Sequence, residues 1–160
     1  MSILAPYELS GGEVRPEWID YNGHMNLAYY IVLFDQATDA LFDALDLGVD
    51  YRRKRNLGTF VAEMHTRYER ELLVGEQVRV TVQLLDIDDK RLYVGHEMFR
   101  LKDGLRSATL ETMFLHVSLL ERRVVPMPPD LKARVDAVFA MHSKLPKPDW
   151  IGRRVAMPQR

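Results

Sequence analysis

The sequence predicts an α+β fold in which an antiparallel sheet of about five strands wraps around one long central helix. Two observations carry this prediction. Residues 27–47 contain no Gly or Pro and begin with eight consecutive apolar residues, whereas the segments after residue 58 alternate apolar and polar residues with the period of a β-strand. Because the sheet has to cover its apolar face, and residues 27–47 are the most apolar segment, we expect the helix to lie against it.

The predicted helix has recognisable ends and two different halves. Asn26 is a suitable N-cap and Gly48 a suitable stop. The first half is apolar on every side, which predicts nearly complete burial. The second half is amphipathic and is expected to reach solvent, since an aspartate recurs at every fourth position: Asp35, Asp39 and Asp43.

Five segments are predicted to form the sheet, one before the helix and four after it. Short turns rich in Gly, Asp and Lys join the later ones, so neighbouring strands should run antiparallel. The clearest alternation is that of Val78, Val80, Val82 and Leu84 with polar residues. The expected strands lie within residues 5–15, 60–69, 78–84, 91–101 and 105–119.

The rest of the chain predicts a short helix and a tail. Apolar residues recur at helical spacing over 130–142, and the proline cluster before them ends the sheet. We therefore expect one domain over residues 1–143, followed by a Pro-containing basic tail over 144–160 that is extended or partly disordered. A curved sheet around a single helix leaves apolar surface uncovered, so a homodimer or homotetramer is expected.

Composition narrows the class of function. The chain has 160 residues, 47% hydrophobic and 28% charged, which is typical of one globular domain. Its 22 basic and 23 acidic residues give a formal charge of −1, so we expect neither a nucleic-acid nor a membrane partner. The absence of cysteine excludes thiol nucleophiles and cysteine-ligated zinc. With no signal-peptide pattern at residues 1–12, we expect a cytoplasmic location.

A tight polar segment, Asp20-Tyr21-Asn22-Gly23-His24-Met25-Asn26, leads directly into the most apolar part of the chain. Asp20 stands a few residues before a helix N-terminus, where free backbone N–H groups and the positive end of the helix dipole attract an anion. The same N–H groups would stabilise a thioester oxygen that becomes negative during acyl transfer, by about 2.7–4 kcal/mol per donor. A capping or turn residue is the structural alternative for Asp20.

This segment resembles the 4-hydroxybenzoyl-CoA thioesterase family of hot-dog proteins, whose signature is Asp-x-x-Gly-His-x-Asn at the start of the central helix, followed by an aromatic residue. The resemblance covers about residues 13–127 and includes Asp46-Leu47-Gly48 at the end of the helix. Residues 18–38 also look like thioesterases of carnitine breakdown, which would imply betainyl-CoA as substrate. The matching positions are Asp20, Gly23, His24, Asn26, Tyr30, Tyr68, Gly75 and Glu76.

The resemblance implies an acyl-CoA thioesterase without a metal or a separate cofactor, coenzyme A being part of the substrate. Asp20 would act as nucleophile or as general base for water, and the sequence does not separate these routes. A backbone amide near Leu27 would bind the oxyanion. A non-catalytic acyl-CoA-binding or assembly protein of the same fold stays open as an alternative. A hot-dog hydratase or dehydratase is the other, although its motif is absent.

Several further residues are candidates for the site, each with a structural alternative. His24 would orient substrate or hold the loop, Asn26 would act chiefly as the N-cap, and Gly23 would supply an unusual backbone angle. Tyr29 would contact the acyl group or a quaternary ammonium, unless it is a core residue. Glu63 would contact substrate, unless it is a solvated partner of Arg67.

A basic run, Arg52-Arg53-Lys54-Arg55, follows the predicted helix. Arg52, Arg53 and Arg55 are candidates for binding the phosphates of coenzyme A, because guanidinium groups pair well with phosphate oxygens. Runs of this kind are also common as solvated surface.

Overall fold

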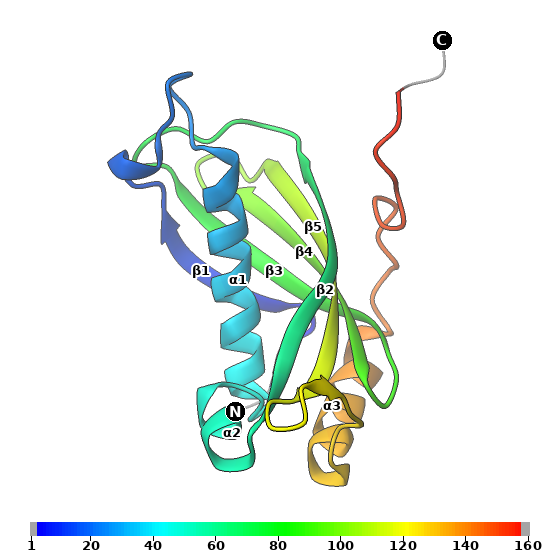
Figure 1. Cartoon of the computed structure of the whole chain (residues 1–160). Helices are drawn as coiled ribbons and strands as arrows, with labels where there is room; N and C mark the ends of the chain where they lie inside the picture. Colours follow the sequence, from blue (N-terminus) through cyan, green and yellow to red (C-terminus); the bar gives the residue numbers. More distant parts are fainter. Residues whose placement is uncertain (1–2, 158–160) are drawn as a thin grey trace.

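The computed structural model of the chain describes residues 3–157 and contains a six-stranded antiparallel sheet (Figure 1). Its order is β1-β3-β4-β5-β2, with the short β6 paired to β5 beside this path. All the pairings are antiparallel, as predicted. The strands are β1 (Tyr7–Glu13), β2 (Leu57–Tyr68), β3 (Gln77–Ile87), β4 (Arg91–Arg100), β5 (Arg106–Ser118) and β6 (Arg123–Val124).

Helix α1 (Leu27–Ala44) lies along one face of the curled sheet (Figure 1), which confirms the predicted α+β architecture with a central helix. Phe34 and Leu41 of this helix are fully buried in the core. Facing them are the side chains of β3 and β4 at alternate positions, as in Val80, Val82 and Val94, because the period of two sends every second side chain towards the helix. A short 3-10 helix, η1 (Pro16–Trp18), precedes the loop that enters α1.

The predicted burial of the first half of α1 on all sides is wrong for this chain. Leu27 is 62% exposed and Val32 is 38% exposed. The helix is also shorter than the expected 27–47, because Asp46 adopts a left-handed conformation with φ of 54° and ends it. The start of α1 therefore has an uncovered apolar surface.

A second helix, α2 (Val49–Arg55), occupies the basic run and was not predicted. Its Tyr51 is buried, and its Arg55 binds Asp130 of α3 (Pro129–His142) through two hydrogen bonds of 2.9 and 2.6 Å. These tertiary contacts stabilise a short segment whose sequence shows only a charge run.

The C-terminal segment packs more closely than an extended or partly disordered tail. Trp150 is only 4% exposed and lies against β4 at Gly95, where an added Cβ atom would come within 3.1 Å of the indole ring. Close packing of the ring thus requires glycine at this position. Residues 1–2 of the predicted domain and 158–160 of the predicted tail lie outside the described residues.

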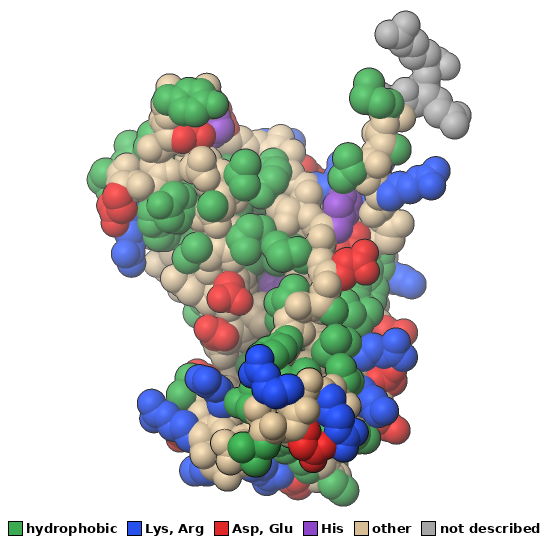
Figure 2. Space-filling view, in the orientation of Figure 1, with side chains coloured by type: hydrophobic (Ala, Val, Ile, Leu, Met, Phe, Trp, Pro, Cys, Tyr) green, Lys and Arg blue, Asp and Glu red, His purple; other side chains and the backbone are tan. Residues whose placement is uncertain are grey.

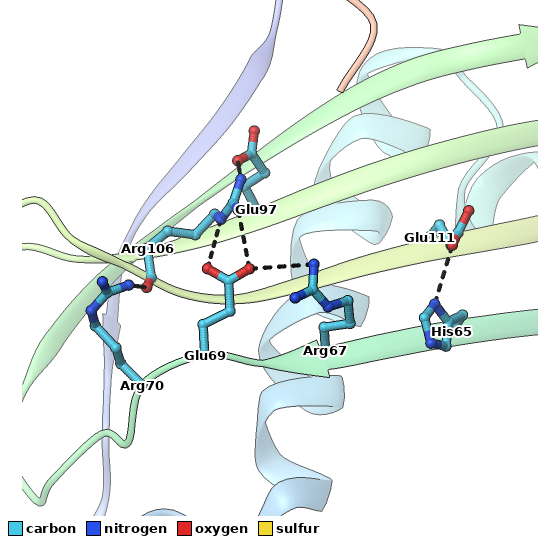
Figure 3. Close-up of polar contacts among 7 residues, drawn as sticks. All are labelled: His65, Arg67, Glu69, Arg70, Glu97, Arg106 and Glu111. Atoms are coloured by element: carbon cyan, nitrogen blue, oxygen red, sulfur yellow. Dashed lines mark hydrogen bonds and ion pairs between the residues drawn. The ribbon is translucent and has the colours of Figure 1, made fainter. Parts of the chain in front are cut away.

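Glu111 of β5 anchors the same segment. Its carboxylate accepts the N–H of Gly152 at 2.8 and 3.1 Å and a hydrogen bond from Tyr93. It also lies 3.2 Å from Nδ1 of His65, the contact drawn in Figure 3. Burial alone would raise the pKa of this carboxyl, but these hydrogen bonds outweigh it and the pKa is lowered. The buried acid therefore stays ionised and fully partnered.

A buried histidine makes the stability of the fold depend on pH. His96 is fully buried between the carbonyl of Leu110 and the hydroxyl of Thr38, and burial lowers its pKa from 6.5 to about 4. The unfolded chain binds a proton below pH 6.5, whereas the folded chain does not until about pH 4. We expect the free energy of unfolding to be largest above pH 6.5 and to fall by about 3 kcal/mol as the pH drops towards 4.

Denaturant unfolding at a series of pH values checks this expectation. His96→Gln should show a shallower loss of stability between pH 6.5 and about 4 than the wild type. Some dependence should persist, because burial also lowers the pKa values of His116 and His142. An unchanged pH dependence in the variant would contradict the assignment to His96.

Candidate active site

The loop that carries Asp20 is a closed hairpin in front of α1. The N–H of Asn26 donates to the carbonyl of Trp18 at 2.9 Å, and the N–H of Asp20 donates to the carbonyl of His24 at 3.1 Å. The turn is closed by Gly23, whose φ of 83° suits glycine and whose N–H bonds the Asp20 carbonyl at 3.0 Å. The predicted unusual backbone angle at Gly23 is confirmed, and the hairpin fixes Asp20 relative to the helix.

The Asp20 carboxylate is half-buried and only partly engaged. One of its oxygens accepts the N–H of Asn22 at 2.8 Å. Among residues 3–157, no hydrogen bond is found for the other oxygen. The side chain thus combines a turn-stabilising role with a free oxygen that is available for chemistry.

The N-terminus of α1 offers a free amide beside this loop. Asn26 is the N-cap, as predicted, and its side chain accepts the N–H of Ala28 at 3.0 Å. The N–H of Tyr29 bonds the Asn26 carbonyl at 3.1 Å. The N–H of Leu27, the first of the helix, has no partner among the described residues, which leaves it able to bind an anionic oxygen.

Aromatic packing stabilises the loop that carries Asp20. Trp18 and Tyr29 are stacked, with ring centroids 5.1 Å apart and planes 11° from parallel. The Arg15 guanidinium lies 5.2 Å from the Trp18 ring centroid. Tyr29 therefore has a structural role, which was the alternative to substrate contact. Its contact with substrate stays a prediction.

A pocket of about 360 Å³ opens where the start of α1 meets the end of β2. Two tyrosines form its inner wall, with ring centroids 5.1 Å apart and planes at 81°. Tyr68 donates a hydrogen bond to the Leu27 carbonyl at 3.2 Å, and Tyr30 donates to the Arg70 carbonyl at 3.3 Å. The lining residues are His24, Met25, Leu27, Tyr30, Tyr68, Glu69, Arg70 and Glu71.

Two charged side chains at the rim are committed to other partners (Figure 3). Arg106 binds Glu69 through two hydrogen bonds of 3.0 Å, and it also reaches Glu97 at 2.7 Å. Arg70 donates to the Arg106 carbonyl at 2.7 Å. Glu71, by contrast, is exposed and has no side-chain hydrogen bond or ion pair among residues 3–157.

The single chain brings only some of the predicted site residues together. His24 lines the pocket together with Leu27, and its Nδ1 lies 3.3 Å from the Met25 carbonyl, whereas Asp20 and Asn26 are not among the lining residues. Glu63 instead lines a separate cavity of about 280 Å³, shared with His65 and Glu111. Substrate contact by Glu63 is thus not supported within one chain.

The predicted phosphate-binding arginines lie beyond the opposite end of α1, whose 18 residues span about 27 Å. Arg53 and Arg55 line a cavity of about 650 Å³ there, and Arg52 lines a groove that it shares with Phe60 of β2. Figure 2 shows Lys and Arg side chains gathered at this lower end of the molecule, around α2 and α3. Arg55 is already paired with Asp130, so a phosphate would have to compete with that carboxylate.

No role for Glu71 was predicted from the sequence, and Tyr68 was matched only by family resemblance. Both residues lie far from Leu27 along the chain and meet it only through the packing of β2 against α1. The alternation of β2, which brings Tyr68 to the same face as Met64, is the signal that pointed towards it. Glu71 follows the strand and carries no such signal.

A family model described as the thioesterase-like superfamily matches residues 14–135. The chain belongs to this superfamily. A betainyl-CoA thioesterase of Pseudomonas aeruginosa is 38% identical over 98% of this chain and 96% of its own length. An L-carnitine dehydrogenase/betainyl-CoA thioesterase of Agrobacterium fabrum is 37% identical over 92% of this chain, which corresponds to 30% of that longer protein.

The fold comparison agrees with the family. A Staphylococcus aureus protein solved in complex with CoA superposes with a TM-score of 0.88, at 24% identity, over 99% of this chain and 100% of its own. The predicted hot-dog fold and the predicted thioester hydrolase family are confirmed. None of the helices within residues 3–157 has the length and hydropathy required to cross a membrane.

Proposed function

We propose that this protein hydrolyses the thioester of betainyl-CoA to betaine and coenzyme A. The observation that carries the proposal is the half-buried Asp20 carboxylate on a closed hairpin that leads directly into α1, whose first N–H, that of Leu27, has no partner among the described residues. A carboxylate and an oxyanion donor are the two groups that acyl transfer needs. The names of the relatives from Pseudomonas aeruginosa and Agrobacterium fabrum support the choice of acyl group.

In the proposed reaction the thioester oxygen faces the Leu27 N–H. Asp20 either attacks the carbonyl carbon itself or removes a proton from a water that attacks it. The resulting tetrahedral oxyanion is stabilised by the Leu27 N–H, and its collapse expels the coenzyme A thiolate, which takes up a proton. On the first route, water then hydrolyses the mixed anhydride to release betaine and restore Asp20.

The neighbouring residues act mainly through position in this proposal. Gly23 and Asn26 shape the turn and the helix start, while His24 lines the pocket and orients the acyl group. Tyr29 supports the loop through Trp18. No metal or additional cofactor is required for this chemistry.

We further propose that the working unit contains a homodimer built on β2. This 12-residue strand forms one edge of the sheet and exposes Phe60, Val61 and Met64 at 48%, 50% and 42%. Figure 2 shows several separate groups of hydrophobic side chains on the upper half of the molecule. A long apolar edge strand is a template for pairing with a second copy.

The arginines of α2 lie far from the pocket within one chain. Antiparallel pairing of two β2 strands about a two-fold axis would place them near the pocket across the interface. The strand begins beside α2 and ends at Tyr68, so the start of one copy would meet the end of the other. Arg52 and Arg53 of one subunit would then approach the pocket of its partner. This arrangement supports a phosphate-binding role for these two residues.

Neutralising Arg52 and Arg53 together is expected to raise KM for the acyl-CoA about tenfold, with a much smaller effect on kcat, because the phosphates are remote from the reacting carbonyl. Steady-state kinetics of the Arg52→Gln/Arg53→Gln variant provide the measurement. Lys144→Gln, which removes a basic residue elsewhere, serves as the control. A fall in kcat with unchanged KM would contradict phosphate binding by these arginines.

Thiol release from a panel of aromatic, short aliphatic and betainyl thioesters of coenzyme A tests the activity directly. The expected result is release from betainyl-CoA at the highest kcat/KM. Tight binding of acyl-CoA without thiol release for any member would instead support a non-catalytic binding protein of the same fold.

A further inference from the structure

The chemistry of betainyl-CoA limits where its charged group can lie. Only two bonds of about 1.5 Å each separate the ammonium nitrogen from the carbonyl carbon. With the carbonyl oxygen at the Leu27 N–H, the trimethylammonium group would lie close to Leu27, and the pocket that Leu27 lines is the space next to it. That pocket, of about 360 Å³, is formed by the start of α1 and the end of β2.

A quaternary ammonium carries a full positive charge but no N–H group. It is therefore held by aromatic faces and by nearby negative charge rather than by hydrogen bonds. Tyr30 and Tyr68 supply two rings at 81°, which meet as the corner of an aromatic cage. Tyr68 is 46% exposed and presents the accessible ring, while the nearly buried Tyr30 supports it.

The two phenols are held in place as neutral hydrogen-bond donors. Tyr68 donates to the Leu27 carbonyl, which ties its ring to the turn of α1 that supplies the oxyanion amide. Burial raises the pKa of Tyr30 to about 12, and the charge of Glu71 acts in the same direction. Glu71 lines the same pocket as these two tyrosines.

Glu71 supplies the free negative charge of the pocket. Of the three charged residues in the lining, Glu69 is paired with Arg106, and Arg70 keeps its positive charge while its guanidinium donates to the neutral Arg106 carbonyl at 2.7 Å. Glu71 has neither an ion pair nor a side-chain hydrogen bond within the described part of the chain. An unpaired carboxylate beside an aromatic corner attracts a cation and offers nothing comparable to a neutral acyl group.

We infer that Tyr68 and Glu71 form the subsite that selects a quaternary ammonium acyl group. This inference rests on the proposed thioesterase function, because it uses the Leu27 amide to locate the carbonyl. In the subsite, the Tyr68 ring contacts the methyl groups and Glu71 balances the charge.

A neutral isostere of the substrate tests the subsite. 3,3-Dimethylbutanoyl-CoA has the shape of betainyl-CoA, with carbon in place of the charged nitrogen. The wild type is expected to prefer betainyl-CoA over this isostere by about tenfold or more in kcat/KM. Equal rates for the two thioesters would overturn the inference while leaving the thioesterase function intact.

Two pairs of variants assign the preference to residues. Glu71→Gln should lower kcat/KM for betainyl-CoA about tenfold and leave the isostere unaffected, whereas Glu17→Gln, an exposed acid outside the pocket, should change neither. Tyr68→Leu should remove most of the preference, and Tyr68→Phe, which keeps the ring, should retain it. Equal losses for both thioesters in Glu71→Gln and Tyr68→Leu would show that the two residues are only structural.

Binding gives a readout that does not depend on turnover. Asp20→Asn, titrated with each thioester by calorimetry, should bind betainyl-CoA about tenfold more tightly than the isostere, and the added Glu71→Gln change should remove the difference. If the wild type hydrolyses neither thioester but Asp20→Asn shows this difference, the proposed function fails and the cation subsite stands. Equal binding of the two thioesters overturns the subsite.

Discussion

Asp20→Asn is expected to reduce kcat for betainyl-CoA by about 10³-fold, because both available routes require the carboxylate and a general base alone contributes about 10²–10⁴-fold. The change should leave the fold intact, since an Asn oxygen can still accept the N–H of Asn22 that Asp20 accepts at 2.8 Å. Steady-state thiol release, measured beside thermal unfolding of both proteins, checks the two parts of this expectation.

The matched control is Asp46→Asn, which removes an exposed carboxylate at the other end of α1 and should not affect kcat. Turnover in isotopically labelled water then separates the two routes, because label appears in the Asp20 carboxylate only if Asp20 attacks the thioester. Full activity of Asp20→Asn would rule out both routes and leave Asp20 as a turn residue.

The features that the sequence predicted correctly depend on local interactions. Asn26 caps α1 through its own side chain, and Gly23 takes the positive φ that the tight segment required. The alternation of Val78, Val80, Val82 and Leu84 predicted β3, because these side chains are buried on the face that packs against the helix. Such signals lie within a few residues of one another, so they can be read without knowing the rest of the fold.

The features that the sequence did not predict depend on distant contacts. Helix α2 is stabilised by the pairing of Arg55 with Asp130, which are 75 residues apart. Trp150, in the C-terminal segment, is buried because it reaches Gly95 of β4. The pocket also depends on a distant contact, because Tyr68 reaches the Leu27 carbonyl only when β2 packs beside α1. A charge run, a proline-containing tail and a strand end give no local sign of these partners.

Breaking the proposed β2 interface is the second change with a large expected effect. Val61 is 50% exposed near the middle of the edge strand, and a carboxylate there would have to be desolvated in a β2–β2 contact. We expect Val61→Asp to run as a single chain in sedimentation experiments, whereas the wild type runs at twice that mass or more. Its kcat/KM should fall about tenfold or more, because the pocket would lose both Arg52 and Arg53 of the partner subunit.

The control has to separate loss of the interface from loss of the fold. Leu4→Asp places the same charge on a residue that is 68% exposed ahead of β1, the strand at the opposite edge of the sheet, and it should remain dimeric and active. Thermal unfolding of Val61→Asp shows whether the isolated chain still folds. It is measured at a protein concentration low enough for the wild-type dimer to dissociate as well, so that single chains of both proteins are compared. A folded Val61→Asp dimer with normal activity would exclude the β2 edge as the interface. A folded monomer with normal activity would instead mean that one chain holds the complete site, and the arginines of α2 would then have no part in binding coenzyme A.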